Sequence, residues 1–115
     1  MRRLVLLALV PLHALALTPA AKEWLAISAR LEPVQCERRQ LRRQIVLAEV
    51  EERAADAQKL RARAAALSRD KDTARLERRL AELEKRILDG KGGTRDPEDL
   101  QAISLQQREA FYRCD

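Results

Sequence analysis

The sequence has 115 residues, of which 36% are charged and only 3% are aromatic. A chain with so few large rings cannot fill a thick globular core, and its composition favours helices that pack side by side through thin seams of leucine and alanine. The formal net charge is +5. The basic residues lie among acidic neighbours without interleaved aromatic rings, so we expect no nucleic-acid partner.

Residues 1–20 have the features of a secretory signal peptide. Two arginines precede an apolar run over residues 4–17, and small residues follow it. As a helix this run spans about 21 Å, less than the roughly 30 Å of a membrane core. Two tripeptides with small first and last residues, ending at Ala16 and Ala20, offer cleavage sites. We expect cleavage, with an uncleaved membrane anchor as the alternative, and a single helical domain over residues 21–115.

Helix-forming patterns follow in order. Residues 20–31 predict a short helix that Pro33 ends or redirects. Residues 36–88 contain no glycine or proline and are dense in strong helix formers. Their apolar stripe changes face near residues 68–72, where Ser68, Asp70 and Asp72 are all good N-cap residues. Either the helix continues there with a rotated packing face, or the chain turns.

The C-terminal part of the sequence contains clear helix-end signals. Gly90 is placed to act as the C-cap of the preceding helix. Asp96 as N-cap and Pro97 at the first helical position predict a last helix, which carries Phe111 and Tyr112 near its end. The stripe before Gly90 consists of leucines and one isoleucine at helical spacing: Leu76, Leu80, Leu83 and Ile87.

The two cysteines distinguish between a turn and a continuous helix. In an exported protein Cys36 and Cys114 are expected to pair, within the chain or between two chains of a homodimer. One helix over residues 36–88 would be about 79 Å long and would keep Cys114 far from Cys36. With a turn near residues 68–72, the two meet. We therefore predict an all-α fold, an elongated antiparallel helical hairpin of coiled-coil type. Its long helix, residues 36–68, packs against residues 73–88 plus 97–114. The disulfide closes the open end of the hairpin and lies next to Phe111 and Tyr112.

Candidate chemistry is scarce. The one histidine, His13, lies within the expected signal peptide, and the sequence has no nucleophile with a base, no glycine-rich phosphate loop and no zinc-ligand spacing. We therefore expect no catalytic, cofactor or metal site, and no enzyme. The candidate interaction residues are Trp24, which is first of all a packing anchor, and four arginines that are either solvated or bind an acidic protein or anionic lipid: Arg38, Arg39, Arg42 and Arg43.

These features predict a small exported, non-enzymatic helical protein, periplasmic in a Gram-negative source or secreted. It acts through contact with an unknown envelope or secreted protein. Two alternatives stay open. One is a membrane-anchored coiled-coil linker with an uncleaved N-terminal segment, the only case with a membrane contact. The other is a holdase-type periplasmic chaperone.

Overall fold

The structure, a computed structural model, describes residues 17–89 and 96–114. Four helices occupy nearly all of this part of the chain, and no strand occurs in it: α2 (Pro19–Val50), α3 (Ala54–Arg69), α4 (Lys71–Asp89) and α5 (Pro97–Arg113). The fold is therefore all-α and elongated, with extents of 73 × 42 × 24 Å, as predicted. Most of the expected signal peptide and the predicted C-cap at Gly90 lie outside the described residues.

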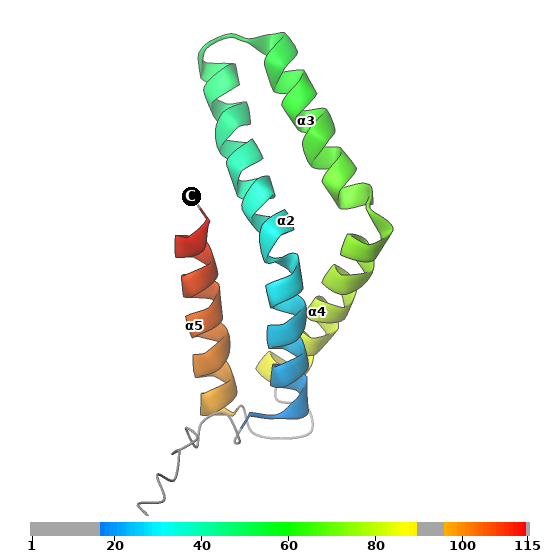
Figure 1. The fold of residues 1–115 in the computed structure, drawn as a ribbon, viewed down its shortest axis with the longest axis vertical. Helices are drawn as coiled ribbons and strands as arrows, with labels where there is room; N and C mark the ends of the chain where they lie inside the picture. The colour runs from blue at the N-terminus through cyan, green and yellow to red at the C-terminus, as the bar shows by residue number, and fades with distance from the viewer. Residues whose placement is uncertain (1–16, 90–95, 115) are drawn as a thin grey trace, which may run out of the picture.

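The long helix α2 runs the length of the molecule, and the other helices are arranged along it (Figure 1). Its second half forms a two-helix hairpin with α3, and its first half lies between α4 and α5. Because α3 and α4 both run antiparallel to α2, α5 returns parallel to it (Figure 1). We call the α2–α3 part the distal hairpin and the part made of α2, α4 and α5 the base.

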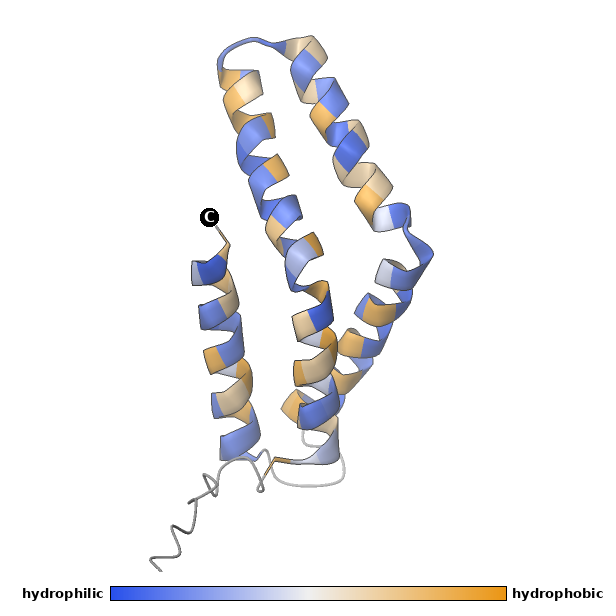
Figure 2. Ribbon diagram, viewed as in Figure 1, coloured by the Kyte–Doolittle hydropathy of each residue, from blue (hydrophilic) through white to orange (hydrophobic). Residues whose placement is uncertain are grey.

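The hydrophobic core lies in the base. Every helix alternates hydrophobic and hydrophilic residues along its length (Figure 2), and the hydrophobic stripes of the three base helices meet. This arrangement confirms the predicted stripe of α4. The cluster of buried residues consists of Ala21, Trp24, Ile27, Leu31, Leu80, Leu83, Ile87 and Ile103. In the distal hairpin, by contrast, the buried apolar residues are small or few: Leu41, Ala48 and Ala57.

The first correction concerns Pro33, which does not end a helix. It lies inside α2, so the predicted short helix 20–31 is the first part of a 32-residue helix. Proline removes the hydrogen bond to the carbonyl of the residue four positions earlier, Ala29. Both residues are exposed, so water can bind that carbonyl, while Leu31 on the opposite side of α2 stays buried. The packing of the buried side therefore holds the helix together through the proline.

The second correction concerns the reversal of the chain, which occurs at residues 51–53 and not at 68–72. The amide of Arg53 donates to the carbonyl of Ala48 at 2.8 Å, and the amide of Glu52 donates to that of Glu49 at 3.1 Å. These two bonds form a Schellman motif, which usually has glycine in the left-handed residue. Here Glu52 occupies that position, with φ of 59°. The predicted helix 36–68 is therefore wrong. The sequence did not indicate the turn, because the glycine that normally marks it is absent.

The predicted boundary near residue 70 is present, but as a bend. Asp70 accepts a hydrogen bond from the amide of Thr73 at 2.9 Å, and this bond lowers the pKa of the Asp70 carboxyl. The residue thus caps α4 as its side-chain type predicts. The chain bends here without reversing, and α4 runs back toward the first half of α2 (Figure 1). Residues 73–88 and 97–114 therefore lie in α4 and α5, which run antiparallel to each other beside α2. They do not follow one another in a single line along α2, as was predicted.

A glycine at the hairpin turn should stabilise the protein. Glu52→Gly relieves the left-handed strain of a residue with a Cβ, and we expect a gain of about 0.5–1 kcal/mol in the free energy of unfolding. Urea denaturation measures it. The matched control is Glu51→Gly, which makes the same change in charge at a residue with φ of −84°. It should not stabilise, and a gain of equal size in both variants would contradict the turn described here.

The assignment of the core face of α4 is tested by two leucines of the same helix. Leu83 is 1% exposed and Leu88 is 44% exposed. We expect Leu83→Ala to lower the free energy of unfolding by about 2–5 kcal/mol, because it leaves a cavity in the base. Leu88→Ala should change it by only about 0.5 kcal/mol. Similar losses in thermal or urea denaturation would show that the packing face of α4 is different.

Candidate functional site

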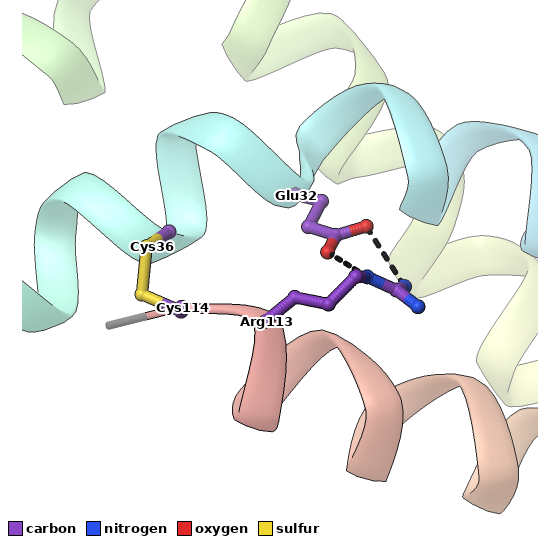
Figure 3. The surroundings of a disulfide bond; sticks show 4 residues. All are labelled: Glu32, Cys36, Arg113 and Cys114. Atoms are coloured by element: carbon purple, nitrogen blue, oxygen red, sulfur yellow. Dashed lines mark hydrogen bonds and ion pairs between the residues drawn. A yellow bond between two sulfur atoms is a disulfide. The ribbon is translucent and has the colours of Figure 1, made fainter.

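A disulfide joins Cys36, in the middle of α2, to Cys114, directly after α5 (Figure 3). The two Cα atoms are 5.4 Å apart, within the range typical of disulfides. The predicted intramolecular pairing is confirmed, but the turn predicted near residues 68–72 is not what brings the two cysteines together. Both cysteines lie 18 residues after the N-cap residue of their helix, which is Thr18 for α2 (36 − 18) and Asp96 for α5 (114 − 96). Because α2 and α5 are parallel and begin at the same height, the two cysteines also lie at the same height.

The level start of α2 and α5 is held by Thr18 and Asp99. The backbone amide of Thr18 donates to Oδ1 of Asp99 at 3.0 Å, and its hydroxyl donates to Oδ2 at 2.5 Å. Asp99 is only 3% exposed. A buried carboxylate needs such donors, and the N-terminal turn of its own helix adds a favourable dipole. This contact holds the start of α5 beside the start of α2, and the disulfide holds the end of α5 beside the middle of α2.

An ion pair lies about one turn of α2 before the disulfide. Arg113 donates to both carboxylate oxygens of Glu32, at 2.7 and 3.1 Å, and reaches across from α5 to do so (Figure 3). These hydrogen bonds lower the pKa of Glu32 and raise that of Arg113. Both side chains are partly solvated. The pair therefore orients the end of α5 more than it stabilises the fold.

Next to the disulfide the surface forms a hollow of about 540 Å³, which we call the arginine–aromatic hollow. Its lining combines three arginines of α2 with the end of α5: Arg39, Arg42, Arg43, Phe111, Tyr112 and Cys114. The guanidinium of Arg39 lies 5.2 Å from the centre of the Phe111 ring, a cation–π distance. The Phe111 and Tyr112 rings meet edge to face, 5.7 Å apart. Both rings are exposed, so they are available to a second molecule.

A second hollow, of about 390 Å³, brings four of the five candidate interaction residues together, namely Trp24, Arg38, Arg39 and Arg42. Arg39, Arg42 and Arg43 line the arginine–aromatic hollow. Arg38 points to α4, where it forms an ion pair with Glu77 at 2.6 Å. Trp24 is 1% exposed, and its ring nitrogen donates to Glu84 of α4 at 3.2 Å. It is thus a core residue of the base, not part of the surface.

The two aromatic residues of the hollow were expected beside the disulfide but not as part of the candidate surface. They do lie next to Cys114, yet both are solvent-exposed. A signal for this exposure was present in the sequence. Ile103 and Phe111 are eight residues apart, and polar Gln107 interrupts the apolar stripe between them. After Ile103, α5 has no further buried side chain, so its last turns have no core to bury the rings in.

The chemistry available elsewhere is limited. Across residues 17–89 and 96–114, no group of three His, Cys, Asp or Glu side chains is arranged to hold a metal ion. None of the helices described is both long and apolar enough to cross a membrane.

In comparisons with known proteins, no family model, no curated protein and no solved structure matches the chain.

Breaking the disulfide should destabilise the protein and loosen α5 first. In the chain-entropy model, a crosslink between residues 78 apart contributes about 4.5 kcal/mol to the free energy of unfolding. Reduction or the double change Cys36→Ser with Cys114→Ser should therefore lower the melting temperature. Amide hydrogen exchange should accelerate most after Ile103, where α5 has no buried side chain, and less around Leu83. Uniform acceleration along all helices would contradict this order.

Proposed function

We propose that the chain is a small exported, non-enzymatic helical protein, periplasmic or secreted, that acts by binding another protein. In this proposal the binding surface is the arginine–aromatic hollow, and the partner is an envelope or secreted protein with an acidic segment that also carries an apolar group. The observation that carries the proposal is that three arginines and two exposed rings surround one hollow.

The charge of the hollow supports an acidic partner. Several arginines elsewhere bind a glutamate of a neighbouring helix: Arg38, Arg61, Arg63, Arg79 and Arg113. Arg42 and Arg43 form no ion pair with any residue that the structure describes. Their charges are thus left for a partner, and complementary charge directs association and orientation.

The rings support a protein interface in particular. Aromatic residues and arginine are enriched in the centres of protein interfaces, where they contribute much of the binding energy. Phe111 and Tyr112 are also held in place by the disulfide two or three residues later. Less conformational entropy is then lost on binding. The same disulfide supports the exported location, because disulfides persist mainly in oxidising compartments.

A photoreactive phenylalanine analogue at position 112 tests this surface. Incorporated into the full-length protein in cells that export it, it should give a covalent adduct with one acidic envelope or secreted protein, identified by mass spectrometry. The control position is Val50 in the distal hairpin, which is 74% exposed against 72% for Tyr112. We expect no adduct from position 50, because equal exposure alone does not make an interface.

Two charge-reversal variants identify the role of the arginines. Arg42→Glu with Arg43→Glu should reduce the adduct by about tenfold or more, equivalent to about 1.4 kcal/mol of binding. Arg75→Glu with Arg78→Glu makes the same change in net charge on α4 and should leave the adduct unchanged. Equal loss in both variants, or no adduct at all, would refute the proposal.

Other results would support a different function. An adduct from position 50 alone would move the binding to the exposed apolar residues of the distal hairpin, Val46, Leu47 and Val50, and would favour the holdase-type chaperone. An adduct of twice the chain mass would identify a homodimer.

A further inference from the structure

The contact between Thr18 and Asp99 bears on where an export leader is removed. The sequence offers two cleavage sites, after Ala16 and after Ala20. We propose that the leader is cleaved between Ala16 and Leu17, so that the mature protein begins at Leu17. This inference rests on the proposed export and specifies the single peptide bond at which the leader is cleaved.

Cleavage after Ala20 would remove a residue that the fold uses. Thr18 supplies two donors to the buried Asp99, from its amide and from its hydroxyl. That cut would take both donors away from Asp99, and the loss of hydrogen-bond donors to a buried carboxylate is costly. The same cut would remove the N-cap of α2, because the Thr18 hydroxyl accepts from the amide of Ala21 at 3.2 Å.

Leu17 is the first residue that the structure describes. This residue precedes α2 and packs against the core cluster of the base. The alternative cleavage site, between Ala20 and Ala21, lies inside the first turn of α2, and Ala21 is fully buried. Among the described residues, cleavage before Leu17 therefore keeps all those that the base uses at this end of α2, whereas cleavage before Ala21 does not.

The chemistry of the cut also fits the first site. A signal peptidase adds one water across the Ala16–Leu17 bond, which leaves a carboxylate on Ala16 and an α-amino group on Leu17. Ala14 and Ala16 then provide the small residues that such an enzyme reads before the cut.

The new amino group is positively charged and lies one residue from the Thr18 amide that binds Asp99. The first turn of α5 is acidic, with Glu98 and Asp99, and one oxygen of Glu98 is buried without a hydrogen-bond partner among the described residues. A mature N-terminus at Leu17 therefore puts a positive charge beside an acidic turn.

The test is the N-terminus of the protein exported by cells that express the full-length gene. Intact mass and N-terminal sequencing should give a chain that begins at Leu17. A chain that begins at Ala21 would overturn the assigned bond and leave export standing. A membrane-bound chain that retains Met1 would overturn the export proposal itself and support the membrane-anchored linker.

Two matched variants separate the sites independently of folding, because the leader is read before the domain folds. Ala16→Phe should block removal of the leader, whereas Ala20→Phe should still yield a chain that begins at Leu17. The opposite pattern would refute the proposal. In the mature protein, Thr18→Val should lower the melting temperature by about 4 °C or more, because it removes one donor to Asp99. An unchanged melting temperature would remove the physical reason for the assignment.

Discussion

The packing of α2 against all three other helices is the constraint on which the structure depends. Each of the other described helices lies against α2, and the contacts of α3 and α5 with α4 are fewer. Of the three largest fully buried side chains, Trp24 and Leu31 belong to the first half of α2, and Leu83 belongs to α4. The buried residues of the second half of α2, which packs against α3, are a single leucine and a single alanine, Leu41 and Ala48. The base is thus a small conventional core, and the distal hairpin is a narrow seam that depends on α2 staying helical through Pro33.

Ion pairs accompany this packing at almost every level of α2. Glu23 binds Arg79 of α4 through both carboxylate oxygens at 2.8 Å, which lowers the pKa of Glu23. Glu37 and Glu49 bind arginines of α3 in the distal hairpin. Exposed pairs of this kind contribute little to stability. A seam with so few buried apolar residues, however, distinguishes poorly between neighbouring registers, and opposite charges at fixed heights along α2 favour one register.

Much of the fold follows from the sequence, because the deciding signals are local. The cap of α5 is an example: the amide of Glu98 donates to Asp96 at 2.9 Å, as the Asp-Pro pair predicts. The helix boundary at Asp70 and the buried stripe of α4 follow in the same way from side-chain type and spacing. The disulfide was predicted from the presence of two cysteines, which pair in an oxidising compartment.

What the sequence does not predict are the places where tertiary packing overrides a local rule. Pro33 normally ends a helix, but here its missing hydrogen bond faces water. Glu52 is an unusual residue for a left-handed turn, so a search for glycine or proline misses the reversal. The arginine–aromatic hollow is predictable only in part, because its arginines and rings meet through the parallel pairing of α2 with α5, which depends on Thr18 and Asp99.

The position of the disulfide also determines how the parts of the chain are connected covalently. Cys36 precedes the turn at residues 51–53 and Cys114 follows it, so the crosslink closes a ring that contains the whole of α3 and α4. Arg53 in that turn is exposed, and exposed turns are preferred sites of proteolytic cleavage. A single cut there opens the ring without dividing the molecule, since the two pieces stay joined through sulfur. In an oxidising compartment, the protein can therefore be nicked at its distal end while the base and the surface beside the disulfide remain in one piece.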